Sequence, residues 1–393
     1  MESRILTING GSSTIKFAVF QGTDAPERIL SGVVDRIGRP DATLAATDLA
    51  SGEKHNTPIH AGDHREAAHC LIDWIERWSG ERRFDAIGHR VVHGGVRLDR
   101  HQRITPDLIE ELCRTQPLDL AHLPREIALI KAFDERFKDV TQFACFDTVF
   151  NRTLPRIAQI LPIPRRYFEA GIRRVGFHGL SYAYLLEELR RIDSAAAEGR
   201  VILAHLGSGS SMTALFQGMP VDTSMGFTPT SGLMMGTRSG DMDPGLLVYI
   251  MRTEKLTPEQ LDEFVSHRCG VLGVSDSTAD MRELIARRGD DERAREAFDL
   301  FCYKAKKWIG AYAAVLGGLE TLVFSGGIGE HAPEVRAGIC EGLEFLGVRL
   351  DSALNAASTA SAGIISSRDS RVVVRVQPTD EELMIARIVV ELV

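Results

Sequence analysis

Two arginines stand in short motifs that combine small and apolar residues. Arg90 lies in the segment Gly-His-Arg-Val-Val-His-Gly-Gly at residues 88–95, and Arg238 lies in the loop of residues 235–241. The planar guanidinium group of arginine binds a carboxylate or a phosphate through two parallel hydrogen bonds. A single arginine is usually a solvated surface charge. The apolar neighbours of Arg90 favour a binding role instead, and Val92 on the same strand face would contact a short alkyl tail.

An aspartate and a histidine accompany the arginines. Asp147 follows a predicted strand at residues 141–146, at the carboxyl end where open α/β sheets bind their ligands. It would polarise a nucleophile or hold Mg²⁺, although an aspartate that only caps a turn fits equally well. His178 has glycines on both sides in Gly-Phe-His-Gly, which gives a ligand close access; a structural histidine is the alternative. Together these side chains match the needs of phosphoryl transfer.

Glycine-rich turns follow several predicted strands, at residues 9–13, 207–211 and 326–329. Consecutive small residues let backbone N–H groups converge on phosphate oxygens. Each turn taken alone is more simply a tight turn, but their recurrence favours phosphate binding. The chain has no Gly-Lys dipeptide of a P-loop and no dinucleotide-binding glycine motif, so it belongs to neither of those classes.

His89 and His93 do not form a zinc site. The β-branched residues around them predict a strand at residues 86–92, and four strand residues would separate the two imidazoles by about 13 Å. The six cysteines are scattered and form no Cys-x-x-Cys pair, so we expect reduced thiols of a cytoplasmic protein.

A repeated hairpin indicates two related domains. Strand patterns flank Gly-Gly-Ser-Ser at residues 10–13 and Gly-Ser-Gly-Ser-Ser at residues 207–211, and both copies end in Phe-Gln-Gly. The shared turn and the shared strand exit point to an internal duplication. Strands and helices alternate after each hairpin, which predicts an α/β fold. Strands are expected at residues 86–92, 141–146, 321–325 and 371–376, and helices at 65–78, 127–137, 182–192, 257–265, 293–316 and 379–392.

The last predicted helix begins with Thr379-Asp380-Glu381-Glu382, the spacing of a capping box with Thr379 as the N-cap. It follows the strands of the second domain, and we expect it to pack against the first. The segment of residues 151–164, rich in proline and arginine, is the best domain boundary.

The composition and charge of the chain limit the classes of partner that we expect. The chain has 393 residues, 44% of them apolar and 25% charged, with a net charge of −8 and no basic block. Nucleic acid is therefore not an expected partner. No signal peptide and no run of about 18 apolar residues is found, so we expect no membrane segment.

The motifs at residues 5–16, 88–95, 146–149, 175–181, 205–211, 235–244, 326–330 and 379–385 together resemble the acetate kinase family. The resemblance implies two duplicated ribonuclease-H-like domains with an active-site cleft between them, the fold shared with sugar kinases, actin and the Hsp70 ATPase. Residues 1–151 with a helix at about 383–393 would form the acyl-substrate domain, and residues 152–382 the nucleotide domain. It also implies a homodimer, ATP and ADP as co-substrates, and Mg²⁺ or Mn²⁺.

The resemblance assigns roles by motif. The catalytic residues would be Arg90, Asp147, His178 and Arg238, and the acyl pocket would hold Arg90, Val92, Ala121, Phe177 and Pro229. Asn9 and Glu381 correspond to the residues associated with the metal. The nucleotide-binding residues would be Ser12, Lys16, His205, Leu206, Gly207, Ser208, Gly209, Asp280, Met281, Arg282, Gly327, Ile328, Gly329, Glu330 and His331.

Five positions depart from the common family pattern. Ser208 replaces an asparagine in Gly-Asn-Gly, Tyr182 and Asn151 replace histidines, and His331 replaces an asparagine. We expect these changes to tune activity without abolishing it. Ala121 stands where a pocket leucine is usual, which would admit a longer acyl chain.

The implied reaction is the reversible phosphorylation of acetate by ATP through direct in-line transfer. A carboxylate is already a nucleophile at neutral pH, so the reaction needs no strong general base. A kinase for propionate or another short carboxylic acid is the first alternative. A non-enzymatic, nucleotide-gated module of the actin or Hsp70 type is the second, and Arg90 with Val92 argues against it.

Overall fold

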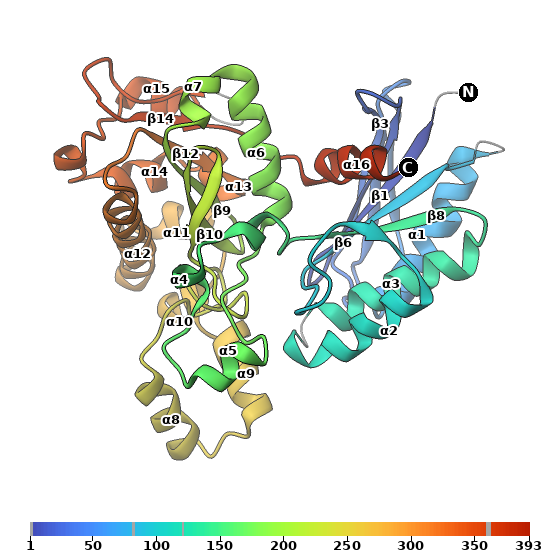
Figure 1. Ribbon diagram of the computed structural model, residues 1–393, viewed down its shortest axis with the longest axis horizontal. Coiled ribbons are helices and arrows are strands. Elements are labelled where there is room, and N and C mark those ends of the chain that lie inside the picture. Colours follow the sequence, from blue (N-terminus) through green and yellow to red (C-terminus); the bar gives the residue numbers. More distant parts are fainter. Residues whose placement is uncertain (1–2, 81–82, 120–121, 359–362) are drawn as a thin grey trace. The chain divides into compact units, whose positions relative to one another are not determined.

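The computed structural model describes residues 3–80, 83–119, 122–358 and 363–393. The chain forms two compact units (Figure 1). Unit 1 runs to Val149 and also includes Asp380–Val393, and unit 2 is the continuous segment Phe150–Thr379. Each unit is built on one mixed sheet with helices packed against it.

The sheet of unit 1 has the strand order β5-β4-β3-β2-β1-β6-β8-β7. Its strands are β1 (Arg4–Gly10), β2 (Ile15–Gln21), β3 (Glu27–Asp35), β4 (Thr43–Asp48), β5 (Lys54–Pro58), β6 (Ala86–Val91), β7 (Gln102–Arg103) and β8 (Thr141–Phe146). The strands β1 to β5 are joined antiparallel, whereas β1, β6 and β8 run parallel. The carboxyl ends of β1, β6 and β8 therefore meet at one edge of the sheet.

Unit 2 repeats this plan. Its sheet has the order β11-β10-β9-β12-β14-β13, in which β9 and β10 form an antiparallel hairpin and β9, β12 and β14 run parallel. The strands are β9 (Arg200–Leu206), β10 (Ser210–Phe216), β11 (Met219–Thr223), β12 (Thr321–Ser325), β13 (Gly363–Ile364) and β14 (Val373–Val376). The central order and strand directions match those of unit 1, so the predicted duplicated α/β fold is confirmed.

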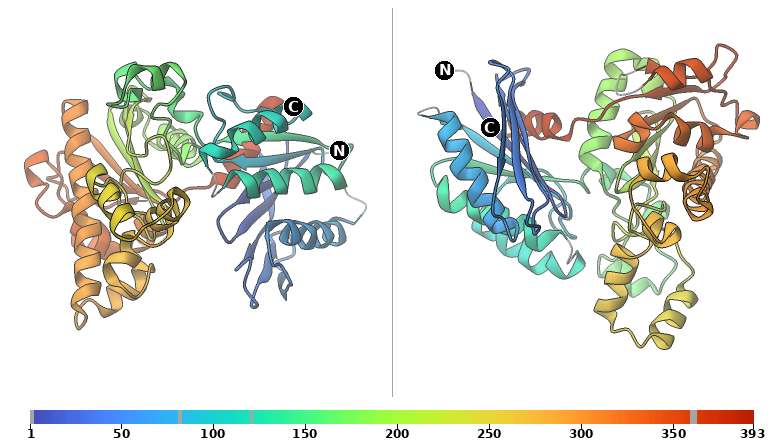
Figure 2. Two further views of the ribbon diagram at one scale, coloured as in Figure 1. Left: turned by 90° about the horizontal axis from the view of Figure 1, so that it is seen from below. Right: turned by 180° about the vertical axis from the view of Figure 1, so that it is seen from behind.

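Helices cover both faces of the unit 1 sheet. The helices α1 (His64–Ser79) and α3 (Leu123–Arg136) bury leucine, isoleucine and phenylalanine side chains against β1 and β2. The helix α2 (Pro106–Thr115) packs on α3, and α16 (Glu381–Leu392) lies against β1 and β6, as Figure 2 also shows. The helix α3 begins before the predicted residue 127, because Pro124 is tolerated in a first helical turn.

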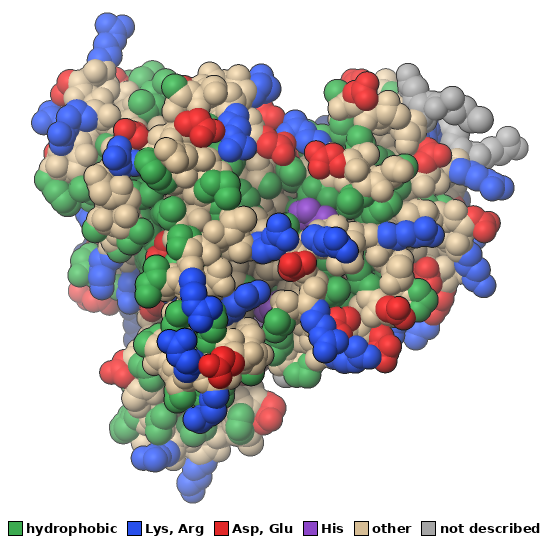
Figure 3. All heavy atoms as spheres, in the orientation of Figure 1, with side chains coloured by type: hydrophobic (Ala, Val, Ile, Leu, Met, Phe, Trp, Pro, Cys, Tyr) green, Lys and Arg blue, Asp and Glu red, His purple; other side chains and the backbone are tan. Residues whose placement is uncertain are grey.

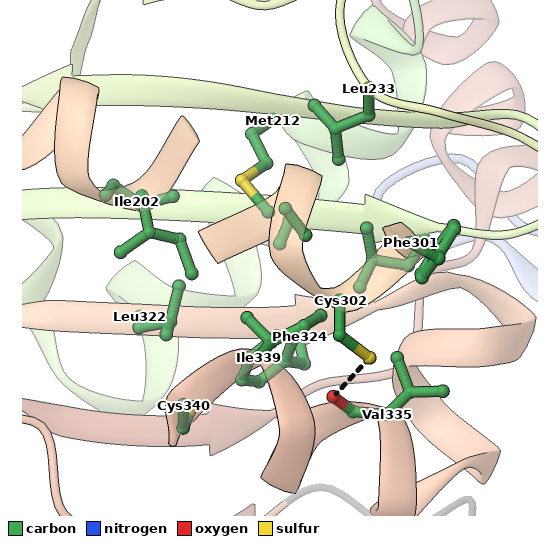
Figure 4. Packing of buried hydrophobic residues seen from close by; sticks show 14 of the residues in the cluster. Ile202, Met212, Leu233, Phe301, Cys302, Leu322, Phe324, Val335, Ile339 and Cys340 are labelled. Carbon is green, nitrogen blue, oxygen red and sulfur yellow. Dashed lines mark hydrogen bonds between the residues drawn. The ribbon is translucent and has the colours of Figure 1, made fainter. Parts of the chain in front are cut away.

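Unit 2 is likewise layered. On one face α6 (Gly179–Ile192) and α7 (Ser194–Ala197) bury Leu185 and Leu189 against β9. On the other, α11 (Met281–Arg287), α12 (Glu292–Leu316) and α14 (Pro333–Cys340) enclose the larger core drawn in Figure 4, which includes Phe301 and Phe324. The remaining α-helices are α4 (Arg156–Gln159), α5 (Arg165–Glu169), α8 (Pro244–Thr253), α9 (Pro258–His267), α10 (Gly270–Ser275), α13 (Gly326–His331) and α15 (Ser352–Ala357).

Several predicted boundaries were wrong, and three of them bear on the site. The strand expected at residues 86–92 ends at Val91, and the strand expected from residue 371 begins at Val373. Thr379 is not the N-cap of the last helix: the Asp380 carboxylate accepts a hydrogen bond from the Leu383 N–H at 2.9 Å, and α16 begins at Glu381. A carboxylate is at least as good a cap as a hydroxyl group, and the favourable dipole interaction adds to it.

Among the described residues, no helix combines the length and the apolar character that crossing a bilayer requires.

Gly88 on β6 provides the space in which α16 packs. A Cβ atom at this position would lie 2.4 Å from Ile385 Cγ2 and 2.8 Å from Val389 Cγ2. We expect Gly88→Ala to lower the free energy of unfolding by about 1 to 3 kcal/mol, because an added methyl group in a packed interface forces its neighbours apart. Urea denaturation followed by circular dichroism measures the change.

Gly310→Ala is the matched control, because nothing lies within 4 Å of a Cβ atom at that position in α12. This control should be neutral or gain up to about 1 kcal/mol from helix propensity. Equal unfolding midpoints for Gly88→Ala and the parent would contradict the packing role of Gly88.

Candidate active site

The predicted residues of unit 1 meet at the carboxyl ends of its parallel strands. Asn9 is near the end of β1, Arg90 is on β6, and Asp147 directly follows β8. The register sets Arg90 beside Cys145, and the Asp147 N–H donates to the Val91 carbonyl oxygen at 3.0 Å. Parallel pairing therefore brings together three residues that are far apart in the sequence.

Arg90 and Asp147 form a buried ion pair. Arg90 Nη2 lies 2.6 Å and Nε 3.1 Å from Asp147 Oδ2, and Asp147 is completely buried. Burial opposes the charge of Arg90, but the Asp147 and Glu381 carboxylates outweigh it, so the pKa of Arg90 is raised. Arg90 Nη1 also donates to the Gly10 carbonyl oxygen at 3.2 Å. The guanidinium group is thus fixed in position and permanently charged.

The first turn of α16 adds two carboxylates to this group. Asn9 Nδ2 donates to Glu381 Oε2 at 2.9 Å and to Glu382 Oε1 at 3.0 Å. Glu381 Oε2 also lies 3.9 Å from Arg90 Nε. Two carboxylates and an amide oxygen form a donor set that suits Mg²⁺, which is usually held by one or two carboxylates together with substrate phosphates. The residues present therefore fit a magnesium ion.

Glu126 is a site residue that the sequence analysis missed. It lies on α3, and its Oε2 accepts a hydrogen bond from the Val92 N–H at 3.0 Å. Burial raises the pKa of Glu126 to about 8, against the lowering effect of Arg90 and of this hydrogen bond. The signal was its place on the apolar stripe of α3, three residues after Leu123 and four before Ile130, where a glutamate is unusual.

The raised pKa of Glu126 predicts a pH-dependent stability. Because the folded state holds the proton more tightly than the unfolded chain, stability falls as the pH rises from about 4.5 to about 8 and levels off above that. Glu126→Gln should lack the pH-dependent part of the stability that comes from this carboxyl group. Its thermal midpoint should therefore fall less than that of the parent between pH 5 and pH 8.5. Scanning calorimetry measures both midpoints. Parallel curves for parent and variant would show that Glu126 is ionised at neutral pH.

The structure describes the residues predicted for the acyl pocket, with the exception of Ala121. Val92 is 2% exposed and follows β6 in unit 1, where its N–H is held by Glu126. Phe177 and Pro229 are buried residues of unit 2. Ala121 lies outside the described residues.

The predicted nucleotide-binding residues of unit 1 are Ser12 and Lys16. Both are exposed around the β1–β2 turn, and the Ser12 carbonyl oxygen accepts a hydrogen bond from Arg125 at 3.1 Å.

The glycine loops of unit 2 lie side by side. Residues 207–209 follow Leu206 at the end of β9 and residues 326–329 follow the parallel strand β12. The Gly207 N–H donates to the Gly209 carbonyl oxygen at 3.0 Å, which closes the first turn. Gly326 has a φ of 76°, and a Cβ atom there would lie 2.7 Å from the Leu206 carbonyl oxygen. Only glycine fits this contact, which joins the two loops.

The other nucleotide candidates adjoin these loops. The Gly236 N–H donates to the Ser208 carbonyl oxygen at 3.1 Å, and a Cβ atom on Gly236 would be 3.6 Å from the Ala279 carbonyl oxygen. Asp280, the N-cap of α11, pairs with Arg282 at 2.6 Å, and Met281 is buried. Glu330 Oε1 accepts from the N–H groups of Gly326 at 2.9 Å and Thr379 at 3.2 Å. Ile328 and the exposed His331 complete α13.

His178 and Arg238 converge on the turn at Gly209. A Cβ atom on Gly209 would lie 3.1 Å from Arg238 Nη2 and 3.3 Å from His178 Nε2. Arg238 Nη1 donates to the Pro229 carbonyl oxygen at 2.8 Å. The His178 and His205 rings stack with their centroids 4.4 Å apart. A guanidinium group and an imidazole beside a glycine turn suit the stabilisation of phosphate oxygens.

Two of the departures from the family pattern are buried in unit 2. Asn151 follows Phe150 and lies against Gly176, where a Cβ atom would meet Asn151 Nδ2 at 2.5 Å. Tyr182 on α6 hydrogen-bonds Ser211, which in turn bonds His178. Ser208, by contrast, is exposed in its loop.

Comparison with known proteins identifies the family. The model of the acetokinase family matches residues 4–387. An acetate kinase of Rhodopseudomonas palustris is 42% identical, with 98% of each chain covered. The crystal structure of Porphyromonas gingivalis acetate kinase has a TM-score of 0.86 at 35% identity and 98% coverage of both chains. A propionate kinase from Francisella tularensis has a TM-score of 0.91 at 32% identity and full coverage. The chain, with its arginine, aspartate and histidine motifs in place, belongs to the acetokinase family.

Proposed function

We propose that this protein is an acetate kinase, which transfers the γ-phosphoryl group of ATP to acetate and gives acetyl phosphate and ADP in a reversible reaction. The observation that carries the proposal is the match to the acetokinase family over residues 4–387, which includes every motif described above. The buried pair of Arg90 and Asp147 and the convergence of His178 and Arg238 on Gly209 provide chemistry that suits this reaction.

We assign the carboxylate substrate to unit 1. Arg90 would bind the acetate oxygens, and the buried Asp147 would hold its guanidinium group in a fixed orientation. Within unit 1, Val92 would contact the methyl group. Because acetate is ionised at neutral pH, its oxygen is the nucleophile without removal of a proton. The role of Arg90 is to position that oxygen for in-line attack.

We assign the nucleotide phosphates to unit 2. The backbone of residues 207–209 and 327–329 would bind phosphate oxygens, with the loop at Asp280 as a further nucleotide contact. His178 and Arg238 would donate hydrogen bonds to the oxygens of the transferred group. Fixed donors are most effective where negative charge builds up in the transition state.

Asn9, Glu381 and Glu382 would hold Mg²⁺, or Mn²⁺ in its place. Their oxygen atoms are the hard ligands that such an ion prefers, and the hydrogen bonds from Asn9 already keep them together. When bound, the metal ion neutralises charge on the nucleotide phosphates.

A hydroxylamine trap tests the function directly. Acyl phosphates react with hydroxylamine to give hydroxamates, which are measured by their coloured iron complex. We expect a signal that requires acetate, ATP and Mg²⁺ together. An enzyme that forms no hydroxamate from acetate, propionate or butyrate, while still binding ATP, would be a nucleotide-gated module and not an acyl kinase.

A propionate kinase is the second candidate. A solved propionate kinase covers the full chain at a TM-score of 0.91, and Ala121 stands where the family usually has a leucine. Each additional methylene that fills such a space contributes about 0.8 kcal/mol. In the same trap, a kcat/KM for propionate above that for acetate would favour this candidate.

We propose that the protein is a cytoplasmic homodimer. All six cysteines are free thiols, which suits a reducing compartment. The helices α8 and α9, at one end of unit 2 in Figure 1, bury none of their residues, although Leu246, Val248 and Tyr249 are apolar and 41–64% exposed. Figure 3 shows hydrophobic side chains at the surface of this end. Exposed apolar groups of this kind favour a subunit contact. Sedimentation equilibrium would give twice the chain mass.

A further inference from the structure

Tyr182, which departs from the family pattern, is linked to His178 through one intervening side chain. It lies on α6 four residues after His178, on the same side of the helix, and its side chain is completely buried in a cluster with Leu185 and Leu203. The Tyr182 hydroxyl group hydrogen-bonds Ser211 Oγ, and Ser211 Oγ lies 2.8 Å from His178 Nδ1. A hydrogen-bonded chain therefore runs from Tyr182 through Ser211 to the imidazole.

The His178 ring is also fixed by its backbone and by a neighbouring ring. His178 caps α6 with a φ of 60°, a left-handed conformation that a residue with a side chain rarely adopts. Strained conformations of this kind gather at functional sites, where the surrounding structure holds them. His205, which pairs with Ser211 across the β9–β10 hairpin, stacks on the His178 ring. Rotation of the imidazole is therefore restricted from two sides.

The hydrogen bonds that link Tyr182, Ser211 and His178 have a preferred direction of donation. A phenol is a stronger hydrogen-bond donor than an aliphatic hydroxyl group, because it is the stronger acid. In the direction that this acidity favours, Tyr182 donates to Ser211 Oγ, and the hydrogen atom of Ser211 is directed to His178 Nδ1. A neutral imidazole that accepts at Nδ1 carries its proton on Nε2. Nε2 is the atom 3.3 Å from the Cβ position of Gly209, where Arg238 Nη2 also converges.

We infer that Tyr182 is a positioning residue, which acts through Ser211 to hold the His178 ring with its Nε2–H directed to the turn at Gly209. The inference rests on the proposed function, in which this turn receives a phosphate oxygen and Nε2–H donates to it. Removing the hydrogen-bond partner that orients a metal-binding histidine commonly costs about 10- to 100-fold, and we expect the lower end of that range for this histidine.

Variants that each remove one hydroxyl group test the hydrogen-bonded link from Tyr182 to His178. We expect Tyr182→Phe to lower kcat about tenfold, because the hydrogen bond from His178 Nε2–H to the phosphate oxygen weakens. The KM for ATP should change less than twofold, because the loop of residues 207–209 that would bind the nucleotide stays intact. Ser211→Ala should lower kcat at least as much, and the double variant no further. Tyr182→His places at this position the histidine that is common in the family, and it should keep most of the kcat that Tyr182→Phe loses. The control is Tyr312→Phe, because Tyr312 is also buried and its hydroxyl group has no partner among the described residues.

A spectroscopic measurement separates this inference from the reaction itself. The ¹⁵N shifts of the imidazole nitrogens, assigned with His178→Gln, report which ring nitrogen carries the proton. The parent and Tyr312→Phe should show the Nε2–H form, and Tyr182→Phe and Ser211→Ala should show a mixture. A parent that makes no hydroxamate would contradict the proposed function alone. Unchanged shifts and an unchanged kcat in both Tyr182→Phe and Ser211→Ala would overturn the role of Tyr182.

Discussion

Replacing Arg90 by alanine should lower kcat/KM for acetate by about 10³- to 10⁵-fold, the range found when an arginine that stabilises a phosphoryl transition state is removed. The expectation follows from its fixed place at the strand edge, where it contacts both Asp147 and the Gly10 carbonyl oxygen. Steady-state hydroxamate formation measures the change. Arg90→Lys should keep only a small part of the activity, because an ammonium group keeps the charge but not the planar pair of donors.

Loss of Arg90 also removes a buried ion pair with Asp147, and breaking a buried ion pair commonly costs about 3 to 5 kcal/mol of stability. Circular dichroism at the assay temperature must therefore show folded protein before the rate is interpreted. Arg200→Ala is the matched control, since Arg200 is also a strand arginine in an ion pair, with Glu320 at 3.2 Å, and it lies at the amino end of β9. A rate for folded Arg90→Ala within tenfold of the parent would remove Arg90 from the mechanism.

Arg238→Ala should reduce kcat by a similar factor. Arg238 Nη1 donates to the Pro229 carbonyl oxygen at 2.8 Å, which places its Nη2 beside the turn at Gly209. If Arg238 acts mainly on the charge of the transition state, kcat falls while the KM for acetate stays close to that of the parent. Single-turnover measurements in both directions separate the chemical step from product release.

Arg287→Ala provides the comparison for Arg238. Arg287 is a half-exposed arginine of unit 2 that pairs with Asp291, and we expect its removal to leave kcat within about twofold of the parent. Equal rates for Arg238→Ala and Arg287→Ala would show that Arg238 is a surface charge.

The sequence predicted the parts of the fold that local pattern controls. The repeated Gly-Ser-Ser turns located both hairpins, because a tight turn between two strands needs small residues in a short segment. The family resemblance, which rested on the motifs around Arg90, Asp147, His178 and Arg238, is confirmed by the acetokinase model. The assigned role of each residue stays a prediction.

Tertiary contacts decided what the sequence could not predict. The apolar stripe of α3 signals that Glu126 is buried, but its raised pKa also depends on its contact beneath the end of β6, which the sequence does not reveal. Thr379 was misassigned as a helix cap because both Thr379 and Asp380 fit the local pattern. The structure uses Asp380 for the cap, while the Thr379 hydroxyl group lies 2.8 Å from Ser181 Oγ. The link from Tyr182 to Ser211 joins residues 29 positions apart and has no local signature.

The place of α16 in unit 1 sets an order of events during protein synthesis. This helix buries Ile385 and Val389 against strands made at the start of translation, yet the ribosome makes it only after the whole of unit 2. Unit 2 is one continuous segment and can complete its core while the chain is still attached. Unit 1 must wait with one apolar face of β1 and β6 uncovered, so the nascent first unit keeps an exposed, aggregation-prone apolar surface until synthesis reaches the last helix.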